Sequence, residues 1–178
     1  MGMDVYGRKP KTEKGEYFRN NVWYWHPLWD YCEYISPDIT KAVNSPHSND
    51  GDGLGAVASR RLGFALKESV TNGTAEAYVK EYYEKMANLP KSPCVCTVVK
   101  STEDSIGTQL SLMLSQMLYD PTGTIPFPKE ITRDPIEDCS SCNGTGLVNS
   151  FSSHYHINLQ NISDFSDFLI DCGGFNIC

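Results

Sequence analysis

The sequence predicts an α+β fold that is mainly helical and carries short strands. Apolar residues recur with the 3.6-residue period of a helix in several segments, and the side chains of one short segment alternate as in a strand. Glycines and prolines separate these segments. The chain has 178 residues, of which 40% are hydrophobic and 21% charged, so it is long enough to form a globular core. We expect a single domain over residues 1–178.

The N-terminal segment 16–34 is rich in aromatic side chains and contains all three tryptophans. Side chains alternate at residues 22–25 as in a short strand, and the proline that follows is placed to begin a helix over residues 27–35. Large aromatic side chains dominate cores and protein interfaces. We therefore expect Trp23 and Trp25 to anchor the core or to contact a partner protein.

Two helices are predicted next, over residues 53–70 and 74–88. Each has apolar residues along one side, and a polar residue, Asp52 or Thr74, stands where it can cap the first turn. The link between the two helices is a short turn, which favours an antiparallel pair.

The second half of the chain predicts two more helices. The first covers residues 101–120 and is followed by an irregular, proline-rich loop over residues 120–138. The second covers residues 161–172, and the pair Gly173-Gly174 supplies the left-handed backbone that ends many helices.

The seven cysteines include two close pairs. An odd number of cysteines and no secretion signal argue against a disulfide framework, so the pairs are read first as metal ligands. The C-x-x-C spacing in CSSCNGTG lets two sulfurs on a tight turn reach one zinc ion at ~2.3 Å, and C-x-C supplies the second pair. The sequence thus predicts a structural Zn²⁺ in a four-cysteine, zinc-knuckle-like element, a module formed by about residues 92–100 and 136–150. Its predicted ligands are Cys94, Cys96, Cys139 and Cys142.

Other interpretations of these residues stay open. The thiols can be free and buried, or C-x-x-C can be a redox pair. His154 and His156 share one face if their segment is a strand, and they can then replace or supplement a thiol ligand.

The segment CSSCNGTG resembles one half-repeat, C-x-x-C-x-G-x-G, of the DnaJ-type zinc-binding module. The resemblance covers eight residues. The second cysteine pair departs from the repeat, since it is C-x-C without glycines, so the resemblance implies zinc binding and nothing of chaperone function.

Acidic residues dominate the end of the chain. Residues 134–178 contain six acids and no lysine or arginine, in a protein of net charge −7. Asp164, Asp167 and Asp171 recur at helical spacing and form an acidic stripe. Such a surface repels phosphate backbones and attracts basic proteins, so we expect a basic partner and no direct nucleic-acid binding. No apolar run is long enough for a membrane span, and we expect a cytoplasmic protein.

Three segments at the two ends of the chain resemble a family of small proteins carried by phages and prophages. These segments are MGMDVYGRKP with EKGEYFRNNVWYW, SNDGDGL, and FLIDCGGFNIC. Small acidic phage proteins of this kind often inhibit host defence, and anti-CRISPR proteins that bind Cas9-type nucleases are among them.

With the cysteine pairs, the acidic C-terminal quarter, the aromatic N-terminal segment and the absence of a catalytic constellation, this resemblance favours a non-enzymatic, zinc-containing binding protein in the bacterial host cell. Its expected partner is a basic host protein such as an RNA-guided nuclease, whose nucleic-acid loading it would block. The alternative is an enzyme, either a metal-dependent hydrolase that uses His154 and His156 or a thiol redox protein. None of the common hydrolase, phosphate-binding or dinucleotide-binding motifs occurs in the sequence.

Overall fold

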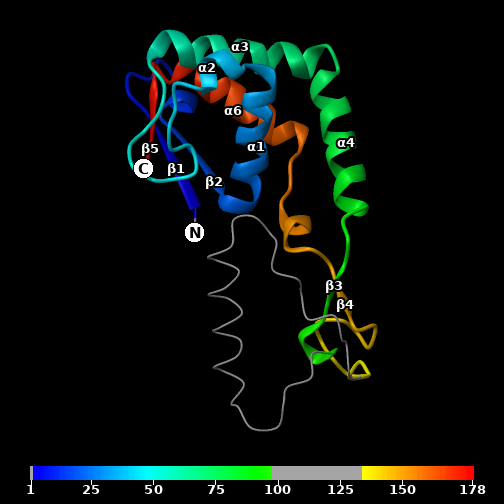
Figure 1. Ribbon diagram of the computed structural model, residues 1–178. Helices are drawn as coiled ribbons and strands as arrows, with labels where there is room; N and C mark the ends of the chain where they lie inside the picture. The colour runs from blue at the N-terminus through cyan, green and yellow to red at the C-terminus, as the bar shows by residue number, and fades with distance from the viewer. Residues whose placement is uncertain (1, 98–133) are drawn as a thin grey trace. The chain divides into compact units, whose positions relative to one another are not determined.

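The structure is a computed structural model that describes residues 2–97 and 134–178, and it has the predicted α+β composition (Figure 1). The chain divides into two compact units. We call Met1–Leu89 with Phe151–Cys178 the core unit, and Pro90–Ser150 the cysteine unit. The helix predicted over residues 101–120 and most of the loop predicted over residues 120–138 lie outside the described residues. The single-domain organisation remains a prediction.

A three-stranded antiparallel sheet joins the two ends of the chain in the core unit. Its strand order is β2-β1-β5, with β1 at Gly2–Gly7, β2 at Tyr17–Asn21 and β5 at Phe175–Ile177. Strand β1 is central, and Val5 lies opposite both Phe18 and Ile177. Both termini therefore lie on the same small sheet (Figure 1).

Helices cover the inner face of this sheet. Both helices predicted in the first half of the chain are confirmed, as is the final helix, but the first two are not antiparallel: the second runs across the direction of the first instead of back along it (Figure 1). The helices of the core unit are α1 at Val22–Ile35, α2 at Pro37–Thr40, α3 at Ala56–Thr71, α4 at Thr74–Ala87 and α6 at Leu159–Asp171.

The strand predicted at residues 22–25 is wrong, because these residues form the first turns of α1. Asn21 caps this helix: its side chain accepts a hydrogen bond from the Tyr24 amide at 3.1 Å. Pro27 lies inside the helix rather than at its start, and it has no N–H to donate to the Trp23 carbonyl. That carbonyl accepts the His156 amide at 2.9 Å instead, which ties α1 to the segment before α6.

The two predicted caps of the helix pair are also wrong. Helix α3 begins after Gly55, and the Asp52 carboxylate accepts hydrogen bonds from the Asn44, Ser45 and Gly53 amides at 2.6, 2.9 and 2.7 Å. These bonds, that from Ser45 first, hold the pKa of Asp52 below its usual value. Thr74 is the first residue of α4 and makes no capping bond with its side chain.

The core lies where α6 packs along α3. Gly63 of α3 permits the close approach, because a Cβ there would stand 2.9 Å from Cγ1 of Ile170. Next to this contact the buried Ser166 hydroxyl donates to the Gly63 carbonyl at 2.9 Å. Helix α6 ends as predicted, with Gly173 and Gly174 at φ of 65° and 95°. The aromatic centre of the core consists of Trp25, Trp29, Phe165, Phe168 and Phe175, all at most 1% exposed.

In the described part of the chain, every helix is too short or too polar to span a lipid bilayer.

Candidate metal centre

A two-stranded ribbon brings the two cysteine pairs together in the cysteine unit. Strand β3 at Ser92–Pro93 pairs antiparallel with β4 at Leu147–Val148. The ladder continues with a hydrogen bond from the Cys94 amide to the Gly146 carbonyl at 2.7 Å. A short 3-10 helix at Val95–Thr97 then turns the chain. The first cysteine pair thus lies directly beside the end of the CSSCNGTG segment.

The CSSCNGTG segment is a chain of turns stabilised by its own backbone. The Asn143 amide donates to the Cys139 carbonyl at 2.7 Å, and the Thr145 amide donates to the Cys142 carbonyl at 3.0 Å. Gly146 has a φ of 71°, and a Cβ on it would stand 2.8 Å from Cγ of Pro135. Only glycine fits this position without strain.

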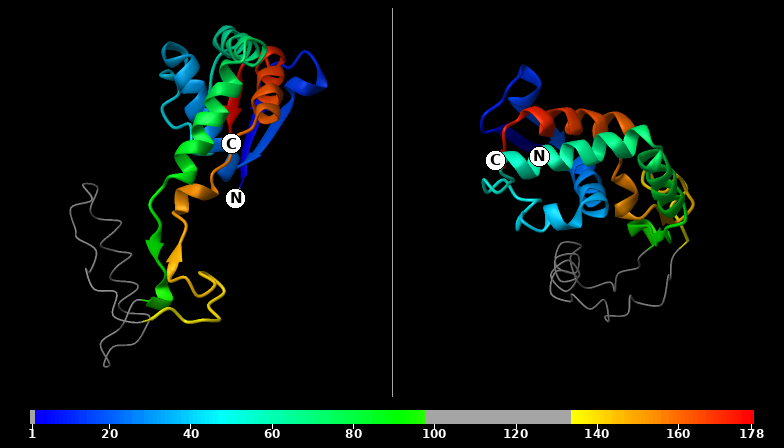
Figure 2. Two further views of the ribbon diagram at one scale, coloured as in Figure 1. Left: turned by 90° about the vertical axis from the view of Figure 1, so that its right-hand side faces the viewer. Right: turned by 90° about the horizontal axis from the view of Figure 1, so that it is seen from above.

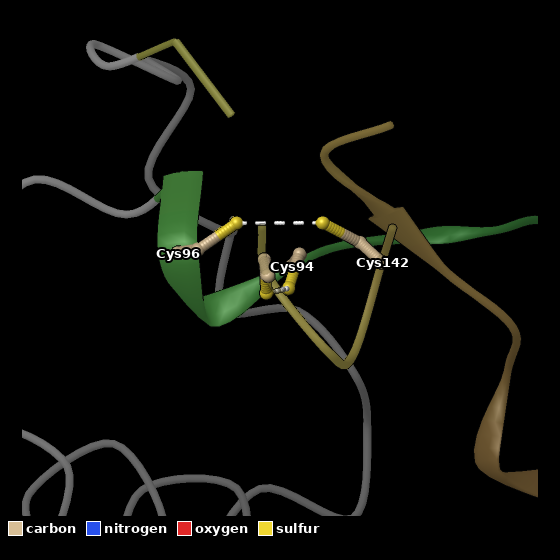
Figure 3. A group of neighbouring side chains, drawn as sticks. Cys94, Cys96 and Cys142 are labelled. Carbon is tan, nitrogen blue, oxygen red and sulfur yellow. Dashed lines mark hydrogen bonds between the residues drawn. The ribbon is translucent and has the colours of Figure 1, made fainter. Parts of the chain in front are cut away.

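The four sulfur atoms of the two pairs form one cluster (Figure 3). The sulfurs of Cys94 and Cys139 are 3.7 Å apart, those of Cys96 and Cys142 are 3.5 Å apart, and all four lie within 4.8 Å of one another. A tetrahedral zinc ion with bonds of ~2.3 Å holds its sulfurs about 3.8 Å apart. A disulfide needs about 2.05 Å. The spacing thus fits four ligands of one ion, and all four cysteines are free.

Backbone amides prepare one of these thiols for metal binding. The amides of Cys142 and Ser141 lower the pKa of Cys139 to about 6, so its thiolate, the form that binds metal, predominates at neutral pH. The amide of Ile136 favours the thiolate of Cys96, but burial and the three neighbouring thiols outweigh it and raise the Cys96 pKa to about 12. The pKa values of Cys139 and Cys96 are thus shifted in opposite directions, and a bound metal cation would favour the thiolate form of both.

The cluster is partly covered by protein. Cys94 and Cys142 are only 2% and 4% exposed, and Cys96 and Cys139 are half-buried. Four thiolates complete a tetrahedral shell and leave no position for water or substrate. A closed shell of this kind is typical of structural rather than catalytic zinc sites.

The histidines do not share the face that a strand would give them. His154 ends a 3-10 helix at Phe151–His154 and packs on Trp23, with ring centres 6.0 Å apart. His156 packs against Tyr24 with tilted rings whose centres are 5.5 Å apart. Among the described residues, the four cysteines are the only group of three or more metal-ligating side chains that lie close enough to share an ion.

The residues predicted to contact a partner have different environments. Trp25 is fully buried and its indole N–H donates to the Pro46 carbonyl at 2.7 Å, so of its two predicted roles it has that of a core anchor. Trp23 is half-buried and its ring centre lies 5.2 Å from that of Phe151, which is 67% exposed.

The acidic stripe is partly neutralised by its own chain. Asp167 pairs with Lys14 at 2.7 Å and with Lys67 at 3.7 Å, which lowers the Asp167 pKa. Asp171 accepts a hydrogen bond from Thr12 at 2.6 Å. The exposed Asp164 accepts one from Gln160 at 2.8 Å.

No family model, curated protein or solved structure matches this chain. Function is therefore inferred from the residues themselves.

Sequence reasoning missed one surface feature, the basic pair Arg60-Arg61 on the exposed side of α3. The sequence ASRRLGF already carries the signal. The two arginines and Phe64 fall on the side of the helix opposite to the buried Leu62 and Leu66.

Proposed function

We propose that the cysteine unit holds one structural Zn²⁺ and that the chain is a binding protein rather than an enzyme. The observation that supports this proposal is the cluster of four sulfurs within 4.8 Å. An all-sulfur tetrahedral site is typical of zinc in proteins. Its closed shell favours a structural role.

The bound ion would act as a crosslink between distant parts of the chain. Cys94 and Cys139 are 45 residues apart, and Cys96 and Cys142 are 46 apart. Closing a loop of this length lowers the entropy of the unfolded chain. If the relation for disulfides applies, this stabilises the folded state by ~3–4 kcal/mol. Coordination itself adds folding free energy. The turns of the cysteine unit would then be fixed by the metal.

Elemental analysis of the purified chain tests the metal. We expect about one zinc ion per wild-type chain and a loss of zinc in Cys94→Ser and Cys139→Ser. Cys178→Ser is the matched control, because Cys178 is exposed and belongs to the core unit. Replacement of zinc by Co²⁺ should give the thiolate charge-transfer band of a tetrahedral sulfur site. A wild-type chain that contains no transition metal would contradict the proposal.

The finer part of the proposal is the partner. The acid-rich C-terminal quarter and the exposed Asp164 favour docking on a basic host protein, such as an RNA-guided nuclease whose nucleic-acid loading is then blocked. A pull-down with such a nuclease at low salt tests it. Loss of retention in Asp164→Lys would support it, and no retention of the wild-type chain would contradict it.

A thiol redox protein is the second candidate, because the same sulfur pairs at 3.5 and 3.7 Å lie close enough to form disulfides after a small movement. The zinc content of freshly purified protein separates the two functions. A metal-free chain whose pairs cycle between thiol and disulfide would favour redox chemistry.

A further inference from the structure

A basic and apolar hollow of about 380 Å³ lies on the core unit, and none of the four clustered cysteines lines it. It is formed where the first turns of α3 run beside the end of α6, and these two helices lie side by side in Figure 2. The side chains that define its character are Lys11, Val57, Arg60, Arg61, Phe64 and Ile170.

The apolar part of the hollow is unusually exposed. Val57 is 76% exposed and Phe64 is 48% exposed, on the face of α3 that does not enter the core. Ile170, from α6, is half-buried beside them. Large apolar side chains grouped on a surface and bordered by polar ones mark a binding site more often than isolated exposed residues do.

The charged part of the hollow consists of three cations, none of which pairs with a carboxylate in the described part of the chain. Among the described residues, Lys11, Arg60 and Arg61 form no ion pair, whereas Lys14 and Lys67 both pair with Asp167. The Arg60 guanidinium instead lies 5.4 Å from the ring centre of Phe64. In a chain of net charge −7, three unpaired cations around one apolar hollow form a local site of opposite sign.

The backbone adds to this positive potential and fixes the edge of the hollow. Helix α3 begins at Ala56, in the lining of the hollow, and its N-cap Gly55 has no side chain to neutralise the partial positive charge of the helix end. The Lys11 amide donates to the Asp171 carbonyl at 2.9 Å, so the backbone that carries Lys11 is held against the end of α6.

We propose that this hollow is the docking site for an acidic peptide segment of a partner protein. One apolar side chain of the segment would lie between Val57 and Phe64, and flanking carboxylates would pair with Arg60, Arg61 and Lys11. Arginine offers the forked donors that suit carboxylates, and it is enriched where interfaces gain most of their affinity. The site belongs to the core unit and does not depend on the proposed metal.

A peptide fits the hollow better than a nucleic acid does. Nucleic-acid binding rests on an extended field of lysines and arginines, whereas this site has three cations on a strongly acidic protein. Its exposed valine and phenylalanine offer an apolar anchor site, which a phosphate backbone does not use. Charge complementarity and apolar burial together thus select an acidic segment with an aliphatic or aromatic residue.

Fluorescence anisotropy on the full chain tests the proposal. The probe is a labelled peptide in which one phenylalanine is flanked by aspartates and glutamates. Two comparison peptides carry lysines in place of the acids, or glycine in place of the phenylalanine. We expect the acidic phenylalanine peptide to bind and both comparison peptides to bind at least about tenfold more weakly.

Two variants locate the binding. Arg61→Glu should weaken the acidic peptide by about tenfold, since it replaces an attraction by a repulsion. Lys80→Glu is the matched control, because it changes the charge equally at an exposed position of α4 and should leave affinity unchanged. Far-UV circular dichroism confirms that both variants fold. Phe64→Ala should weaken binding without changing its dependence on salt.

Three results would overturn the proposal. The acidic peptide does not bind the wild-type chain, or it binds Arg61→Glu and Lys80→Glu with equal affinity. In the third result, the wild-type chain binds single-stranded DNA but not the peptide, and Arg61→Glu weakens the DNA binding. This would make the hollow a nucleic-acid site.

Discussion

In the core unit, tryptophans and phenylalanines from α1, α6 and β5 are removed from solvent and pack on one another. In the described part of the cysteine unit, the buried residues are Cys94, Thr97, Cys142 and Gly146, two of which carry sulfur and none a large apolar side chain. The core unit thus has the interior of an ordinary globular domain. In the described part of the cysteine unit, cysteine side chains occupy the position that apolar side chains occupy in a hydrophobic core.

With the proposed zinc ion bound, the two units would have different sources of stability. Burial of aromatic surface is sufficient for the core unit, since fully burying a large side chain gains about 1.5–3 kcal/mol. A segment without such residues needs another energy source, and small elements of this kind usually take it from a metal or from disulfides. The difference predicts that the two units respond separately to perturbation.

Metal removal should have the largest effect. A strong chelator should unfold the ribbon and turns of the cysteine unit, because structural zinc contributes about 10 kcal/mol in small zinc-dependent elements. Hydrogen exchange followed by mass spectrometry should show lost protection at residues 92–97 and 136–148 and unchanged protection in α3 and α6. The chelator should change nothing in Cys94→Ser. Protection that persists in the cysteine unit after metal is gone would refute its dependence on zinc.

Truncation of a core aromatic side chain should destabilise the core unit and leave the cysteine unit unchanged. Phe165 is fully buried between Trp25 and Phe168, and Phe165→Ala should lower the free energy of unfolding of the core unit by ~3–5 kcal/mol. Urea unfolding followed by tryptophan fluorescence measures this loss, since all three tryptophans belong to the core unit. The zinc content should stay as in the wild type. Parallel loss of zinc would show that the units fold as one cooperative block.

The sequence predicted the helices well where periodicity and backbone chemistry agree. The pair α3 and α4 and the end of α6 at two glycines were predictable, because apolar spacing and left-handed residues act locally. The alternation at residues 22–25 failed, since the cap at Asn21 and the burial of Trp25 favour a helix over a strand. Local pattern cannot show which face tertiary packing selects.

The clustering of the four predicted ligands could be predicted, because the cysteine spacing that suits a zinc ion is visible in the sequence. The helical spacing of the acidic stripe could be predicted from the sequence, but the partners of its aspartates could not. That Lys14 and Thr12 reach Asp167 and Asp171 depends on contacts across more than 150 residues. The hollow on α3 depends in the same way on Lys11 and Ile170, which only the fold places beside the arginines.

Strain in the turn of the cysteine unit should have a smaller effect. Gly146→Ala forces a Cβ onto a left-handed backbone and against Pro135, which costs about 1–3 kcal/mol and should weaken zinc binding without changing core stability. Gly51→Ala is the matched control. Gly51 has a φ of 82°, but a Cβ there meets nothing within 4 Å, and it lies in the core unit. Competition with a chromogenic chelator measures the affinity, and equal affinities of the two variants would contradict the steric argument.

The smallest effect should come from Asp52, and it should depend on pH. Its pKa is lowered in the folded chain, so the folded state gains stability from the ionised carboxylate above the ordinary value of about 3.9, and this gain disappears as pH falls through the lowered value. Asp52→Asn removes the charge but keeps one acceptor for the Asn44, Ser45 and Gly53 amides.

We therefore expect Asp52→Asn to be less stable than the wild type by about 1 kcal/mol near neutral pH, because hydrogen bonds to a neutral acceptor are weaker than those to a carboxylate. The loss is small because the site is partly open to solvent, which screens the charge. The difference should shrink toward zero in strong acid, where Asp52 is protonated and resembles asparagine. Urea unfolding of both proteins across this range measures it. A difference that stays constant into strong acid would show that the carboxylate charge does not stabilise the loop between α2 and α3, and that the side chain acts there through its shape alone.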